Sequence, residues 1–294
     1  MTDDGGENFF CLRVEEVNFL SRDFAESAQR FNQRGIKFVG GHGDVKAFAA
    51  ENKISVETAA RILRYEFLSG VRRDLNCDAI ALAHHADDQA ETILMRLLRG
   101  ATSTGLAAMK FRTRSDDYGL LIRPLLRFRK VELENFCRRR NLTPRLDATN
   151  FEPDATRNRI RLELIPTLET FNPALVDTLC RLAEVTAEES DFIAAQVDKI
   201  FPVVVRDNSI VRAEFLKLHP ALQRAVVKKF VAQVTGSVKD FGFVHFEGVR
   251  NVLLNGLTGV ELPKHFRADL RNGKLTIKRN RESGTSSRFL KRKG

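Results

Sequence analysis

The stretch from Ala79 to Gly100 constrains the fold of this chain more than any other part of it. It begins with five apolar residues, Ala79 to Ala83, which is typical of a strand buried on both faces. A polar turn follows, and apolar residues then recur at helical spacing from Ile93 to Leu98 until Gly100 ends the helix. A buried strand that leads at once into a helix predicts a parallel α/β sheet, in which ligands bind outside the carboxyl ends of the strands. The polar turn is therefore the first candidate for a functional site.

Six polar side chains crowd this turn and the start of the helix. They are His84, His85, Asp87, Asp88, Gln89 and Glu91. Asp87 occupies the position expected of the helix N-cap, and the helix dipole stabilises acids there by about 0.3–1 kcal/mol each. One acid is enough for a cap, however, and three acids beside two imidazoles suit a Mg²⁺ ion with its phosphates or a substrate ammonium group. Capping and ligand binding both stay open as explanations.

The charge of the chain points to a polyanionic partner. The 294 residues include 48 Lys or Arg and 38 Asp or Glu, for a net charge of +10. Residues 123–161 alone hold eleven basic and five acidic residues, a net charge of +6. This concentration indicates a surface for RNA or DNA, although a solvated basic helix would share it. The turn at 147–150 and the placing of Arg157 and Arg161 on one helical face favour the binding function.

The sequence shows neither an export signal nor a cysteine motif. No apolar run approaches the roughly 18 residues of a membrane span, and the first eight residues, MTDDGGEN, are too polar for a secretory signal. The four cysteines are Cys11, Cys77, Cys137 and Cys180. They form no CxxC pair, which disfavours a zinc ribbon, an iron–sulfur site or a persulfide relay. We expect a reduced, cytoplasmic protein without a membrane partner.

The rest of the N-terminal half alternates strands and helices, as a parallel sheet requires. Strands are expected at residues 9–14, 36–39 and 120–123, and helices at 21–34, 45–52 and 56–75. The last of these helices carries Arg61 and Arg64, which suit a phosphate or carboxylate clamp or else a solvated surface. The glycine-rich segment Gly40 to Asp44 lacks both the GxGxxG and the GxxxxGK[ST] spacing, so we predict a plain turn there.

Two prolines, Pro166 and Pro173, mark the entry to a second region. Helical spacing of apolar residues recurs over 174–200, 213–234 and 243–254, and strands at 265–270 and 275–278 flank the hairpin signal Asn272-Gly273. Residues 281–294 have the composition of a disordered tail. We thus expect an α/β domain over 1–165, a small, mainly helical tRNA-binding or linker domain with a terminal hairpin over 166–280, and a basic tail.

Six motifs in this order resemble those of the tRNA(Ile)-lysidine synthetase family of the PP-loop ATP pyrophosphatases. They are AARILRYEF (59–67), HHADDQAETILMRLLRG (84–100), LIRPLLRFRKVEL (121–133), DATN (147–150), RNRIR (157–161) and FNP (171–173). The combination is specific, whereas tRNA thiolases of the same superfamily carry something similar to the acidic motif alone. The resemblance implies an α/β parallel-sheet PP-loop ATPase domain, of the kind also called adenine nucleotide α-hydrolase-like.

The resemblance also implies an activity. In this family ATP adenylates the ring carbonyl of the wobble cytidine in the CAU anticodon of tRNA(Ile), and the ε-amine of free lysine then displaces AMP to give lysidine. ATP and Mg²⁺ are the implied cofactors, tRNA(Ile) and lysine are the implied partners, and a homodimer is compatible with the sequence.

The family motifs carry these implied roles onto particular residues. Catalysis falls to His85, Asp87, Asp88 and Glu91. Mg²⁺ would be held by Asp87 and Asp88. Cofactor binding falls to Arg61, Arg64, His84 and Gln89. RNA binding falls to Arg123, Asn150, Arg157, Asn158 and Arg161.

One family feature is missing from the sequence. The ATP-binding loop SGGxDS, which follows the first strand in the family, occurs nowhere in the chain. Without that strand, its neighbours in the sheet would have unpaired edges, and exposed edges promote aggregation. We therefore expect this polypeptide alone to be poorly soluble, and a truncated gene model or a fragment is the favoured explanation.

Two other functions stay open. A non-catalytic tRNA-binding remnant would keep the basic surface without nucleotide chemistry. Another PP-loop enzyme, such as a thiolase, would share the acidic motif, but the thiolases typically use catalytic cysteines that often form CxxC pairs, and these are missing here.

Overall fold

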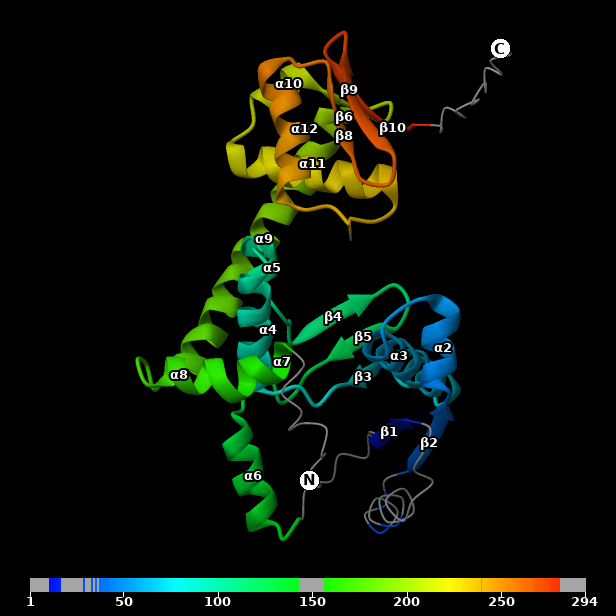
Figure 1. Ribbon diagram of the computed structural model, residues 1–294, viewed down its shortest axis with the longest axis vertical. Coiled ribbons are helices and arrows are strands. Elements are labelled where there is room, and N and C mark those ends of the chain that lie inside the picture. The colour runs from blue at the N-terminus through cyan, green and yellow to red at the C-terminus, as the bar shows by residue number, and fades with distance from the viewer. Residues whose placement is uncertain are drawn as a thin grey trace, which may run out of the picture. The chain divides into compact units, whose positions relative to one another are not determined.

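A computed structural model describes residues 11–16, 29, 33, 35, 37–142, 156–238 and 240–280. The chain divides into two compact units, one ending at Glu184 and the other beginning at Val185. Figure 1 labels the helices and strands of both units. Among the described residues, no helix combines the length and the apolar character needed to cross a bilayer.

The first unit contains two small sheets with parallel pairs. Strand β1 (Cys11–Glu16) pairs in parallel with β2 (Phe38–Gly43). Strand β3 (Ala79–Ala81) pairs in parallel with β5 (Gly119–Ile122), and β4 (Arg112–Ser115) adds an antiparallel edge in the order β3-β5-β4 (Figure 1). The predicted α/β class is confirmed, and the antiparallel edge strand is an addition that the sequence did not indicate.

The glycine-rich segment at 40–43 is part of a strand, so the predicted plain turn is wrong there. The segment belongs to β2, whose Gly40 and Gly41 pair with residues of β1. A Cβ on Gly41 would lie 2.4 Å from an edge carbon of the Phe67 ring. The glycine therefore makes room for an aromatic ring packed directly on the strand, and this tertiary contact outweighs the turn preference of the local sequence.

Nine helical segments in the described part of this unit surround the sheets. They are α2 (Val45–Asn52), α3 (Val56–Asp74), α4 (Ala86–Leu98), α5 (Ser103–Leu106), α6 (Lys130–Arg139), α7 (Thr156–Arg159), the π-helix η2 (Ile160–Leu164), α8 (Ile165–Glu169) and the first part of α9 (Leu175–Val204). Ser55 caps α3 by accepting a hydrogen bond from the Thr58 backbone N–H, as its sequence position predicts.

The boundary between the units lies at 184/185 and not at the expected 165/166. Three residues of α4, Ala86, Ala90 and Leu94, share a buried cluster with Ile165 and Val176. The start of α9 therefore packs on the helix that carries the acidic motif. Pro166 lies in the first turn of α8 and Pro173 in the turn before α9, and both belong to the first unit.

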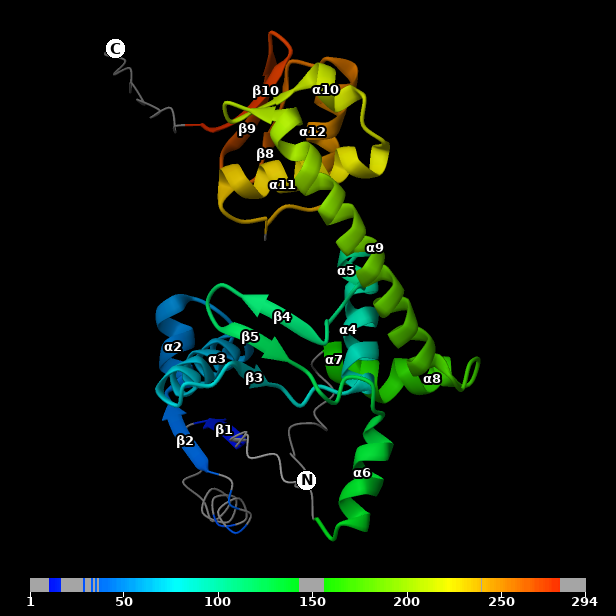
Figure 2. The same ribbon diagram turned by 180° about the vertical axis from the view of Figure 1, so that it is seen from behind.

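The second unit is built on a five-stranded antiparallel sheet with the order β6-β7-β10-β9-β8. Its elements after α9 are β6 (Val205–Arg206), β7 (Ser209–Val211), α10 (Arg212–Leu216), α11 (Pro220–Thr235), α12 (Phe243–Asn255), β8 (Gly259–Leu262), β9 (Phe266–Arg271) and β10 (Lys274–Arg279) (Figure 2). Phe215, Phe230 and Leu275 are fully buried in its core. The predicted hairpin at Asn272-Gly273 is confirmed, with both residues at positive φ.

Candidate functional site

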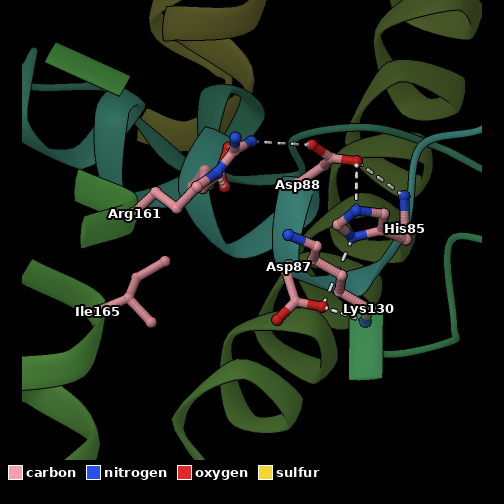
Figure 3. Close-up of a pocket in the computed structure, with 7 residues that line it drawn as sticks. His85, Asp87, Asp88, Lys130, Arg161 and Ile165 are labelled. Carbon is pink, nitrogen blue, oxygen red and sulfur yellow. Dashed lines mark hydrogen bonds and ion pairs between the residues drawn. The ribbon is translucent and has the colours of Figure 1, made fainter. Parts of the chain in front are cut away.

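The acidic motif lies in a pocket of about 340 Å³ in the first unit. Figure 3 shows the side chains that converge there from the start of α4, the start of α6 and the segment η2–α8. The lining residues are His85, Asp87, Asp88, Glu91, Lys130, Arg161 and Ile165. The structure thus brings together all four residues with an implied catalytic role.

Helix α4 begins two residues earlier than its sequence indicates. Its N-cap is His85 and not Asp87, because the carboxylate of Asp88 accepts a hydrogen bond from the His85 backbone N–H at 3.0 Å. This is the reciprocal half of a capping box, in which the third helical residue reaches back to the cap. The shift leaves the Asp87 side chain available to a different segment.

Asp87 binds the start of α6. One carboxylate oxygen accepts from the Lys130 backbone N–H at 2.6 Å, and the other accepts from Arg129 Nε at 3.2 Å. Burial by itself raises the pKa of this carboxyl, but hydrogen bonds from His85, the Lys130 backbone and Arg129 outweigh it and hold the pKa well below its usual range. Asp87 is therefore ionised at every pH near neutrality.

We expect Asp87→Asn to destabilise the protein in a pH-dependent way. A carboxyl whose pKa is lowered on folding stabilises the folded state above its unfolded pKa of about 3.9, and this stabilisation is lost as the pH falls further towards the folded value. The wild-type midpoint of thermal unfolding should therefore exceed that of Asp87→Asn at pH 7, and the gap should narrow below about pH 4. A gap that stays constant from pH 7 to pH 3 would contradict this assignment.

Glu91 is the most enclosed acid of the site, with 1% of its side chain exposed. Arg157 Nε and Arg161 Nε each donate to one of its carboxylate oxygens at 2.6 Å. Arg161 Nη2 adds a bond at 3.1 Å, and Arg157 Nη2 donates to Asp88 at 2.9 Å. Charge-assisted pairs of this geometry fix both partners strongly.

The two arginines therefore have partners that the sequence did not predict. Arg157 and Arg161 lie on one helical face, as their spacing indicates, but these guanidinium nitrogens bind the carboxylates of the pocket. The structure thus places both arginines inside the acidic site, and their expected role as RNA-binding side chains stays a prediction. The π-helical turn η2 begins between them, at Ile160.

A second polar group lies beside the acids, at the carboxyl ends of β3 and β5. Burial lowers the pKa of His84, the Asp88 carboxylate opposes this, and the charges of Arg123, Arg157 and Arg61 lower it further. His84 is therefore a neutral imidazole at neutral pH, and its Nδ1 is buried without a hydrogen-bond partner in the described part of the chain.

Arg123 and Arg61 bring positive charge to His84, and we call these three residues the cationic corner. The side chain of Arg123 is 7% exposed, its Nη1 donates to the Lys110 carbonyl at 2.8 Å, and its Nε is buried without a partner among the described residues. Arg61 stacks its guanidinium on the Tyr65 ring, 5.0 Å from the centroid. A buried imidazole nitrogen and a buried guanidinium N–H without partners suit an anionic ligand.

Other residues with an expected role lie elsewhere. Gln89 is 4% exposed and holds the Met109 backbone through two bonds of 2.8 and 3.0 Å, and its expected role in cofactor binding stays a prediction. Arg64 is exposed on α3 and has no contact with the pocket among the described interactions. Asn158 lies in α7, and Asn150 lies outside the described residues.

Two side chains of the site were missed by the sequence argument. Arg129 binds both Asp87 and Glu169, each at 3.2 Å, and Lys130 lines the pocket. Both belong to the basic segment 123–161, where they counted only as part of a charge total. Their position a few residues after the end of β5, in the segment LIRPLLRFRK that begins within that strand, is the signal that could have placed them at the site.

The described residues contain no cluster of three or more His, Cys, Asp or Glu side chains arranged for a metal ion. Asp87 and Asp88, the expected Mg²⁺ ligands, already accept hydrogen bonds from arginine, histidine and backbone groups. As arranged here, the acids suit guanidinium and ammonium groups better than a bare dication that needs several oxygen ligands.

Comparison with known proteins gives three findings. The profile of the PP-loop domain family matches residues 20–168. The tRNA(Ile)-lysidine synthase of Clostridium perfringens is 36% identical over 243 residues, which are 81% of this chain and 50% of that protein. The enzyme of the same name from Geobacillus kaustophilus is 37% identical over 228 residues, 76% of this chain and 47% of that protein. The chain thus spans about half the length of the curated relatives it matches.

A solved structure matches the fold. The U34-tRNA thiolase NcsA from Methanococcus maripaludis, with its [4Fe-4S] cluster, aligns with a TM-score of 0.51 at 18% sequence identity. The alignment covers 62% of this chain and 63% of that protein. At this identity the likeness concerns the fold alone.

Proposed function

Because the chain belongs to the PP-loop family, we propose that it ligates lysine to the wobble cytidine of a tRNA(Ile) with a CAU anticodon, at the expense of ATP. The observation that carries this proposal is the pocket at the start of α4. Three acids of the motif at 84–100 meet Lys130 of α6 and Arg161 of η2 there. The chemistry requires a site that handles an ammonium group and phosphates side by side.

The acids would receive lysine. Asp87 and Asp88 flank His85, whose ring nitrogens lie 3.5 and 3.4 Å from their carboxylates. A lysine ε-ammonium is a compact cation that such a carboxylate pair binds well. Glu91, whose two oxygens are already bound by arginines, would position Asp88 and the arginines and would not touch the substrate.

The cationic corner would receive ATP. The charges of Arg61 and Arg123 both act on His84, and the partnerless N–H of Arg123 is a donor suited to a phosphate oxygen. ATP supplies the adenylyl group that turns the cytidine carbonyl oxygen into a leaving group, with release of pyrophosphate. The amine of lysine then forms the new C–N bond and AMP departs. Because the acids do not fit Mg²⁺ as they are arranged, we assign no step to the metal.

The competing PP-loop chemistry is disfavoured by the cysteines. Burial raises the pKa of the Cys180 thiol to about 11, and its Sγ donates to the Ala86 carbonyl at 3.6 Å. A thiol in this state is a poor nucleophile at neutral pH. Cys77, Cys137 and Cys180 are all free in the described part of the chain.

The test is a three-component assay on the full chain. We expect AMP release and incorporation of labelled lysine only when ATP, lysine and the CAU-anticodon tRNA are all present. A tRNA with U in place of the wobble C serves as the control and should give neither product. Retention of tRNA without AMP release would instead support a non-catalytic tRNA-binding protein and would overturn the proposal.

A further inference from the structure

The β4–β5 hairpin has Arg112 at its open end and two aspartates in its turn. Arg112 and Arg114 are exposed on β4, and the turn that follows holds Asp116 and Asp117. Arg112 pairs with Ile122, the last residue of β5. Because β5 is parallel to β3, the basic end lies at the carboxyl edge of this pair, the edge from which α4 and its pocket begin.

An exposed aromatic ring stands next to these arginines. Phe111 directly precedes β4 and is 48% exposed. Beyond the β4–β5 backbone ladder, the guanidinium groups of Arg112 and Arg114 have no hydrogen bond or ion pair among the described interactions, and both side chains are exposed. A solvent-facing ring beside unpaired guanidinium groups is the combination with which proteins bind single-stranded RNA, because the ring stacks on a base while the cations contact phosphates.

The segment before Phe111 is held to helix α4, which carries the acidic motif. Gln89 of α4 binds both the N–H and the carbonyl of Met109, and Arg123 binds the carbonyl of Lys110. The backbone N–H of Arg123 also donates to the Phe111 carbonyl at 2.9 Å. The ring is thus held in a set position relative to α4 and to the end of β5, and Figure 1 shows β4 beginning beside α4.

A half-buried side chain, that of Arg96, supports the turn before Phe111. Arg96 donates to the carbonyls of Gly105 and Ala108 at 2.7 and 3.2 Å. Ala108 has a φ of +45°, in the left-handed region that residues with a Cβ rarely adopt. Side-chain bonds that hold such a conformation are found where a segment must be presented in one shape.

We propose that Phe111, together with Arg112 and Arg114, is a contact surface for unpaired nucleotides of an RNA, on the strand that begins at the carboxyl edge of the β3–β5 pair. This surface rests on the proposed function only in that the substrate is an RNA. Phosphates favour the open end of the hairpin, where Arg112 lies, and are repelled at its turn, which carries the aspartates. The competing explanation is that the arginines merely prevent another strand from pairing with the edge strand β4.

The experiment measures binding of two RNA probes to the full chain by fluorescence anisotropy across a salt series. One probe is a hairpin with a single-stranded loop that contains CAU, and the other is a fully paired duplex. Phe111→Leu should weaken binding of the hairpin about tenfold and leave the duplex unchanged, whereas Phe111→Tyr should keep wild-type affinity. Arg112→Ala should weaken both probes and lower the salt slope by about 1.

Arg73→Ala is the matched control, because Arg73 is exposed at the end of α3, on the opposite edge of the sheet. It should change neither affinity nor salt slope. If Phe111→Leu and the wild type bind the RNA hairpin with equal affinity, the proposed RNA-contact surface is overturned. This holds even if the three-component assay shows lysidine formation. Conversely, a selective loss of hairpin binding in a chain that makes no AMP would leave the surface standing while the proposed function fails.

Discussion

Glu91→Gln should lower the thermal midpoint of the first unit by roughly 6–12 °C and abolish activity in the three-component assay. The substitution keeps the shape of the side chain and removes the charge that Arg157 and Arg161 share. Breaking a buried ion pair by removing one partner costs about 3–5 kcal/mol. Because the two arginines are 36% and 29% exposed, we expect the lower end, about 3 kcal/mol, which corresponds to this shift for a unit of this size.

Glu163→Gln is the control for this prediction. Glu163 pairs with Arg159 at 3.6 Å on the same segment, but both side chains are mostly exposed. Exposed pairs of this kind contribute well under 1 kcal/mol, so the midpoint should stay within about 2 °C of wild type. Equal effects of the two substitutions would show that Glu91 is no more important than a surface acid.

Gln89→Leu should destabilise the protein without a specific effect on nucleotide affinity. The substitution leaves the N–H and the carbonyl of Met109 without their side-chain partners, and each unsatisfied buried group costs about 1–3 kcal/mol. Since Met109 is only partly buried, we expect about 2 kcal/mol in total, or a fall of roughly 4–8 °C in the midpoint.

The measurement that decides this case compares stability with KM. If Gln89 held ATP directly, as its motif suggests, Gln89→Leu would raise the KM for ATP and leave the thermal midpoint unchanged. Gln233→Leu, at an exposed glutamine of α11 that bonds only to Asn208 among the described partners, is the control and should change neither quantity.

The sequence predicts the local elements around the site well, because they depend on short-range patterns. The helices at 45–52 and 56–74 and the hairpin at Asn272-Gly273 follow from caps, spacing and turn residues. The strands β6, β7 and β8 are only two to four residues long, too short for the alternation that identifies a strand. Their pairing depends on contacts between distant segments.

The gathering of the acids could also be predicted, since it follows from one turn of one helix. Their partners could not. Arg157 and Arg161 lie 66 or more positions along the chain from Glu91, and composition offers no means of distinguishing an arginine that binds RNA from one that binds a carboxylate. The same holds for Gln89. Its place inside the acidic motif suggests a contact with the cofactor, and the sequence does not reveal its backbone partner 20 positions away.

The capping box of α4 has a consequence for how the pocket works. One oxygen of Asp88 is tied to the His85 backbone, and the other points to Arg157. Only the second oxygen is free to exchange its partner, since the first anchors the beginning of the helix. A ligand that displaces Arg157 would therefore meet a carboxylate whose orientation is already set, and no rotation of that side chain has to accompany its arrival.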